Sequence, residues 1–139
     1  MKRLIIISLL FLTVNACKKK ELSPEGPTDI RIKNLSTLTF EDVIVSTSEK
    51  AGDIDTIGNV ANNSVSDYFR FSKAYPKAEI SAKIHIGGSV VTFSTGAVSY
   101  AYLTYIGRDR VTYEVYISDM NNRVLSINNV ILEEPLVLK

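Results

Sequence analysis

The clearest signal in the sequence is a strict alternation of apolar and polar residues. In residues 77–86, "KAEISAKIHI", Ala78, Ile80, Ala82, Ile84 and Ile86 are separated by polar or charged residues. A period of two predicts a β-strand with one buried face and one wet face. The next two residues, "GG", supply the positive φ angles of a two-residue hairpin turn, so residues 89–95, "SVVTFST", are expected to return as the partner strand.

The same alternation recurs along most of the chain. Residues 110–118, "RVTYEVYIS", place Val111, Tyr113, Val115 and Ile117 on one face. A turn at 119–122, "DMNN", then leads into a partner strand at 123–132. Further strands are predicted at 29–35, 38–47, 64–71 and 100–106. In residues 38–47, "LTFEDVIVST", one buried face is kept only if Glu41 and Asp42 form a β-bulge.

These spacings predict the fold class. Strands recur every eight to twelve residues or so, with turn residues between them, and no long helical period occurs after residue 28. We therefore expect a single all-β domain, an antiparallel β-sandwich rather than a barrel. Residues 49–63, "EKAGDIDTIGNVANN", fit a short helix, an irregular loop or one more edge strand.

The N-terminus has the pattern of a secretory signal peptide. Lys2 and Arg3 precede an apolar run at 4–14, which as a helix would rise only about 16 Å and is too short to span a membrane. The small residue Ala16 then precedes Cys17, so we expect residues 1–16 to be removed. Cys17 is the single cysteine of the chain, so an internal disulfide is excluded. The alternative is an ordinary signal peptide with a chance cysteine beyond the cut.

The sequence Val14-Asn15-Ala16-Cys17 resembles the lipobox of bacterial lipoproteins, although Asn15 replaces the usual small residue. In that family the thiol is acylated and becomes the first mature residue. The resemblance implies that Cys17 carries lipid, and several acyl chains hold a protein stably at a membrane. Residues 17–27 then form a tether rich in lysine, proline and glycine, and residues 28–139 form the domain.

Residues 16–21, "ACKKKE", are similar to small lipoproteins of Bacteroidota. Because Lys18 is not the aspartate that favours retention in the inner membrane, the resemblance implies the outer membrane more than the inner. Residues 30–75 also resemble the body of uncharacterised lipoproteins of this group. That likeness implies an immunoglobulin-like or transthyretin-like sandwich, and it brings no known activity.

The charge balance and the single histidine exclude several classes of binding and catalytic site. Without Lys2 and Arg3 the chain has 14 basic and 15 acidic residues, so it has no electrostatic footprint for nucleic acid. His85 is the single histidine, and its position in the alternation places it on a wet face. A His/Cys metal site is therefore excluded, and no motif around a serine supports a Ser-His-acid set.

The segment at 53–64 partly matches a calcium-binding loop. Asp53, Asp55 and Gly58 fit the first, third and sixth places, but Ile57 and Ser64 stand where the fifth and twelfth ligands are needed. We expect no metal and no cofactor. A looser site using Asp53, Asp55 and loop carbonyls is the alternative.

Tyrosines are the remaining candidates for binding. The chain has seven tyrosines and no tryptophan. Tyr100 and Tyr102 are expected on one strand face, and Tyr116 points away from the core of its strand. Exposed tyrosines suit an envelope glycan or a peptide, although strand propensity and half-buried packing are the simpler explanation. The sequence thus predicts a non-catalytic, lipid-anchored binding or structural module of the cell envelope. The alternative is an inhibitor or accessory module that acts on a secreted enzyme or toxin.

Overall fold

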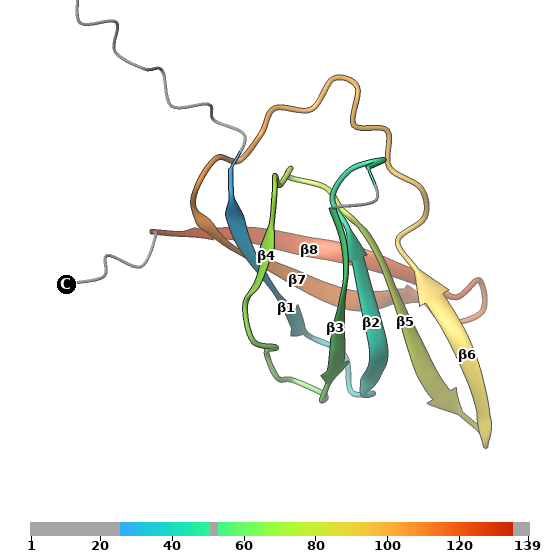
Figure 1. Ribbon diagram of the computed structural model, residues 1–139. Helices are drawn as coiled ribbons and strands as arrows, with labels where there is room; N and C mark the ends of the chain where they lie inside the picture. Colours follow the sequence, from blue (N-terminus) through green and yellow to red (C-terminus); the bar gives the residue numbers. More distant parts are fainter. Residues whose placement is uncertain (1–25, 51–52, 135–139) are drawn as a thin grey trace, which may run out of the picture.

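The chain folds into β-strands in the computed structural model, which describes residues 26–50 and 53–134 (Figure 1). No helix occurs in this part of the chain. The strands are β1 (Thr28–Asn34), β2 (Phe40–Ser46), β3 (Ile54–Val60), β4 (Phe69–Phe71), β5 (Glu79–Ile86), β6 (Ser89–Ser94), β7 (Arg110–Asp119) and β8 (Val124–Glu133).

All eight strands belong to one mixed sheet, in the order β3-β2-β5-β6-β8-β7-β1-β4. The two four-stranded halves are joined by a single residue pair, Ser94 of β6 with Val124 of β8. At the other end of the order, β3 also contacts β1 and β4, so that the sheet is nearly closed into a barrel (Figure 1). The prediction of an all-β domain is confirmed, and the sandwich type is not.

Two strand pairs are parallel, which corrects the prediction of a purely antiparallel sheet. β1 runs parallel to β7 from the pair Asp29–Arg110 to the pair Asn34–Val115. β6 and β8 are parallel at their single pair. Parallel neighbours need a long crossover connection, and here β2 to β6 lie between β1 and β7 in the sequence. Alternation reveals which face of a strand is buried but not the direction of its neighbour.

The hairpin of β5 and β6 is as predicted. Ala78, Ile80 and Ala82 are buried, Ile84 is fully buried and His85 is exposed. Gly87 and Gly88 have φ angles of 56° and 84°, the values of a type I′ turn, and they connect Ile86 to its partner Ser89. The predicted bulge is also present. Asp42 has a φ of 45° and the register shifts between Phe40 and Val43, which turns both of these side chains into the core.

Residues 49–63 contain β3, which lies at the end of the strand order. The edge-strand interpretation is therefore correct, while residues 51–52 lie outside the described part of the chain. The strand predicted at 64–71 is much shorter than expected. Its regular part is β4, and Val65 makes an isolated bridge with Lys33.

The strand predicted at 100–106 is wrong. Residues 95–109 form a long loop, here called loop 95–109, between β6 and β7. Gly96 and Gly107 have φ angles of 81° and 103° and turn the chain at both ends of the loop. The Ile106 amide donates to the carbonyl of Ala74, and the Leu103 amide donates to the carbonyl of Tyr100 within a local turn. These backbone groups are therefore satisfied without a neighbouring strand.

Candidate binding surfaces

Loop 95–109 covers one end of the barrel and is fastened there at several points. Thr28 at the start of β1 donates its hydroxyl to the Gly107 carbonyl. The Tyr100 hydroxyl donates to the Ser46 carbonyl at 2.8 Å and accepts from the Glu79 amide at 3.3 Å. The loop thus connects the start of β1, the end of β2 and the start of β5. We call this end of the molecule the loop end; in Figure 1 the loop is the yellow-to-orange excursion above the strands.

Two tyrosines of the loop pack against a tyrosine of the domain. The ring of Tyr75 has its centre 5.1 Å from that of Tyr100 and 5.0 Å from that of Tyr105. Tyr113, buried on β7, donates its hydroxyl to the Tyr75 carbonyl. Burial raises the pKa of Tyr100, and still more that of Tyr113. Tyr100 therefore packs and fixes the loop, and does not present a free platform.

The three tyrosines predicted as a binding platform are not brought together. Tyr102 is 99% exposed, whereas Tyr100 is half-buried against Tyr75. Tyr116 lies on β7, where it lines a separate depression of about 420 Å³ with Leu35 and Met120. Thr28, at the start of β1, lies at the loop end, whereas Leu35 directly follows the last residue of β1. Tyr116, beside Leu35, therefore lies at the opposite end of the molecule from the loop. The shared face is a wrong prediction, and ligand binding by these tyrosines stays a prediction.

A second candidate surface is the free edge of β6. In a two-residue hairpin the residues that flank the turn exchange hydrogen bonds, and such pairs alternate with pairs whose backbone groups point outward. Ile86–Ser89 is the flanking pair, so the N–H and C=O groups of Val90 and Thr92 point away from β5. Ser94 is the next residue whose backbone groups point away from β5, and its N–H donates to the carbonyl of Arg123, the residue before β8. In the described chain, β8 pairs with β6 at Ser94 alone.

This edge has none of the usual protection against strand pairing. Natural edge strands are blunted by lysine, proline, bulges or very short length. β6 reads "SVVTFS", without a charge or a proline, and Val90 is 54% exposed. The neighbouring polar side chains on β5 are already engaged, Lys83 with Asp42 at 2.8 Å and the ring of His85 with Glu41 at 2.9 Å. Sequence reasoning missed this surface, although an uncharged strand after a glycine turn was the available signal.

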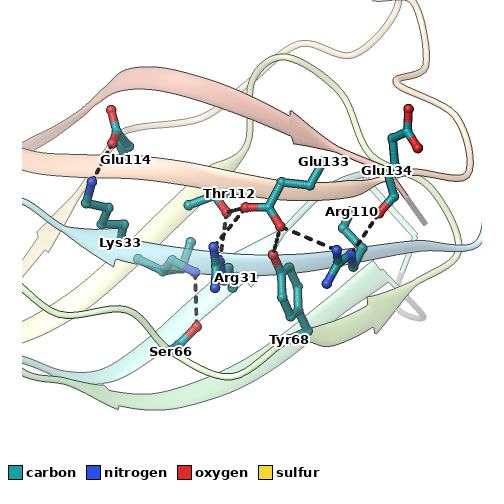
Figure 2. Close-up of polar contacts among 10 residues, drawn as sticks. Arg31, Lys33, Ser66, Tyr68, Arg110, Thr112, Glu114, Glu133 and Glu134 are labelled. Atoms are coloured by element: carbon teal, nitrogen blue, oxygen red, sulfur yellow. Dashed lines mark hydrogen bonds and ion pairs between the residues drawn. The ribbon is translucent and has the colours of Figure 1, made fainter. Parts of the chain in front are cut away.

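A cluster of paired polar side chains covers the outer face of β1, β7 and β8 (Figure 2). Arg31 lies 2.8 Å from one carboxylate oxygen of Glu133, and the Tyr68 hydroxyl donates to the other. The guanidinium carbons of Arg31 and Arg110 lie 4.7 and 5.2 Å from the centre of the Tyr68 ring. The hydrogen bond from Tyr68, helped by both arginines, holds the pKa of Glu133 below its usual value.

This cluster explains why the predicted wet face of β7 is covered. Arg31 donates to the hydroxyl of Thr112, and Lys33 lies 2.8 Å from Glu114. Both Thr112 and Glu114 are consequently buried. A carboxylate held ionised by arginines is a poor general base. The arrangement therefore suits a cluster that covers and stabilises these strands better than a reactive site.

The acidic residues proposed for metal binding are also occupied. Asp53 is buried and accepts hydrogen bonds from the hydroxyl of Ser48, at 2.5 Å, and from the amide and hydroxyl of Ser72. Asp55 is exposed on β3 and accepts from the Thr56 amide. Within residues 26–50 and 53–134, no three His, Cys, Asp or Glu side chains are grouped so that they could hold a metal ion. Cys17, the predicted lipid attachment site, lies outside the described residues.

The part of the chain that the structure describes contains no helix with the length and apolar character needed to cross a membrane. No protein-family model matches the chain, and no curated protein matches it. Among solved structures, the chain is similar to one described as the NMR structure of a protein from Eubacterium rectale. That match has 17% sequence identity and a TM-score of 0.49, and covers 77% of this chain and 93% of the other. A similarity of this size assigns neither fold nor function.

Proposed function

We propose that this protein is a lipid-anchored, non-catalytic module of the bacterial cell envelope, and that it binds a protein partner through the free edge of β6. The anchor is Cys17, at the end of the lipobox-like sequence Val14-Asn15-Ala16-Cys17. The partner contributes an extended segment that pairs with β6. The observation that carries this proposal is the unprotected row of backbone groups at Val90 and Thr92.

The chemistry of the edge indicates the kind of segment that it accepts. Backbone hydrogen bonds supply affinity in strand addition, and the side chains of alternate residues supply specificity. The outward side chains of β6 are those of Val90 and Thr92, the adjacent ammonium of Lys83 is paired with Asp42, and the ring of His85 contacts Glu41. The expected segment is therefore uncharged and rich in β-branched residues, with no requirement for a strong charge of either sign.

The disposition of the polar residues supports binding over catalysis. His85 is exposed and its ring contacts Glu41, and the carboxylates of Asp53 and Glu133 are engaged by Ser48 and Tyr68. These are the arrangements of structural pairs, and catalysis needs a nucleophile, a base and a stabilising group that converge on one point.

Two variants of one residue test the edge. Because the N–H of Thr92 points away from β5, Thr92→Pro removes an outward donor without breaking the ladder to β5. Thr92→Val is the matched control, since it keeps the N–H and the shape. A photoreactive amino acid at position 90 is used to crosslink the partner in cells. We expect a crosslinked protein of defined mass with Thr92→Val and its loss with Thr92→Pro, at equal thermal stability of the two variants.

Two results would contradict the edge as the partner site. One is a crosslink that persists in Thr92→Pro, and the other is the absence of any crosslink from position 90. A product of twice the mass of this chain would mean that the added strand comes from a second copy and not from a different protein. The anchor is tested separately, because Cys17→Ser should move the protein from the membrane fraction to the soluble fraction.

An inhibitor or accessory module that acts on a secreted enzyme or toxin is the second candidate function. The observation that favours it is Tyr102, a large side chain exposed to water near the middle of loop 95–109. An inserted loop of this kind needs Tyr102 to be free in the anchored protein. Burial of Tyr102 in the membrane-bound protein would therefore count against this candidate.

A further inference from the structure

The side chain of Tyr102 is not packed against the rest of the domain. Its side chain is 99% exposed, while Tyr100 and Tyr105 on either side of it pack against Tyr75. The loop that carries it is nevertheless fixed, since Tyr100 is bonded to Ser46 and Gly107 to Thr28. A rigid loop that presents a bare aromatic ring to solvent has the form of a contact surface.

The loop end is also the end at which the chain enters the domain. Gly26, the first described residue, lies against the carbonyl of Ser72, and Thr28 bonds to the loop itself. Nine residue steps separate Cys17 from Gly26, which span at most about 32 Å in a fully extended chain. Val65, which bridges to Lys33 near the far end of β1, lies roughly 20 Å further from this point, judging from the rise per residue in a strand. A lipid on Cys17 therefore lets the loop end reach the bilayer with a short span of tether, whereas the opposite end can reach it only if the tether spans at least about 20 Å of its length.

We infer that loop 95–109 rests on the lipid bilayer, with the ring of Tyr102 in the headgroup region. The inference depends on the proposed lipid anchor. Residues 97–106, "AVSYAYLTYI", contain no charged residue, and tyrosine is enriched where proteins meet the membrane interface. The loop would then be a second contact that sets the orientation of the anchored domain.

Side chains of both signs surround the loop. The proposed contact with the bilayer therefore depends on the ring of Tyr102 more than on electrostatic attraction. Lys73 lies 5.1 Å from the centre of the Tyr105 ring, and Arg108 follows the uncharged run. These cations suit lipid phosphates. Glu49 and Lys50 both line the depression beside Tyr100, however, and Asp109 follows Arg108, so the charges largely offset one another and the attraction to anionic lipid is small.

Because the chain has no tryptophan, a single introduced one reports its own surroundings. The full chain is produced in a Gram-negative host, purified from membranes and reconstituted into vesicles of phosphatidylethanolamine and phosphatidylglycerol. The test variant is Tyr102→Trp and the matched control is Val65→Trp, which is 47% exposed near the far end of β1. We expect brominated lipids to quench the fluorescence of Tyr102→Trp and its emission to shift to shorter wavelength, while Val65→Trp emits as it does in water.

The outcomes separate the inference from the proposed anchor. If the protein floats with the vesicles and the introduced tryptophan of Tyr102→Trp stays in water, the inference is overturned and the anchor stands. Equal quenching of the two variants also overturns it, because the domain then has no preferred orientation. If neither variant floats, the lipid anchor itself has failed. Exposure of position 102 on the vesicle, with burial only on addition of a secreted enzyme, would assign the loop to inhibition.

Discussion

The phenol of Tyr100 donates a hydrogen bond to the main-chain carbonyl of Ser46, across 54 positions of sequence. This contact fastens loop 95–109 to the end of β2, and it turns one of the two adjacent candidate tyrosines into a structural residue. Tyr102, two positions further along the chain, is left in water. The two residues are therefore expected to respond differently to the same substitution.

Replacing Tyr100 by phenylalanine removes the hydroxyl and keeps the ring that packs on Tyr75. Losing the bond to the Ser46 carbonyl, together with the longer one from the Glu79 amide, should lower the free energy of unfolding by about 1 kcal/mol or more. Tyr102→Phe, the matched control, should leave it unchanged. Urea denaturation of the domain measures both values. Equal stabilities of the two variants would show that the hydroxyl of Tyr100 does not fasten the loop.

The face assignment of β5 can be tested on two neighbouring residues. Ile84 is fully buried, so Ile84→Asp places an uncompensated charge in the core and should cost several kcal/mol, comparable to the stability of the whole domain. His85→Gln keeps a polar group beside Glu41 on the exposed face and should cost little. Thermal melts monitored by circular dichroism compare the variants. Similar melting temperatures would mean that the buried face of β5 is assigned wrongly.

The sequence predicted best the features that are local. The alternation at Ala78–Ile86, the glycine turn and the bulge at Asp42 are each set by residues within a few positions of one another, and all three are present. Strand direction was not predictable in this way, because β1 pairs with β7 across some eighty residues. Residues 100–106 have the composition of a strand, yet the packing of their tyrosines on Tyr75 forms a loop instead. Tertiary contacts decided the conformation there.

The candidate site shows the same division. His85 was placed correctly on a wet face, because parity alone decides that position. The separation of Tyr100, Tyr102 and Tyr116 depends on where a long loop lies and where β7 ends, and neither is encoded in a short pattern. The free edge of β6 follows from the order of the strands, which a single sequence does not reveal.

Calcium should not stabilise the domain. Both carboxylate oxygens of Asp53 accept hydrogen bonds from serines, and Asp55 caps the amide of the next residue. A metal that binds the native state alone would raise the melting temperature by mass action. We expect the same melting temperature in chelator and in millimolar calcium. A clear rise with calcium would mean that Asp53 exchanges Ser48 and Ser72 for the metal, and Asp53→Asn should then abolish the rise.

The carboxylate of Asp53 makes the stability of the domain depend on pH. Burial by itself would raise the pKa of this group, but the hydrogen bonds from Ser48 and Ser72, with the nearby charge of Lys73, bring it below the ordinary value of 3.8. Since the folded state holds the proton less tightly than the unfolded chain, the unfolded state binds more protons in acid. The stabilisation from Asp53 is therefore fully present above the unfolded pKa, and it is lost as the pH falls through the folded pKa.

Asp53→Asn tests this assignment, because an amide does not ionise. The variant should be less stable than the wild type at neutral pH, since one acceptor oxygen becomes a donor that faces a serine. Between about pH 5 and pH 2 it should lose less stability than the wild type, because one of the carboxylates with a lowered pKa has been removed. Asp55→Asn, two residues along and exposed, is the control and should follow the wild type. Urea midpoints across this pH range give the comparison. Parallel pH profiles for Asp53→Asn and the wild type would show that the bonds from Ser48 and Ser72 do not hold Asp53 in its ionised form.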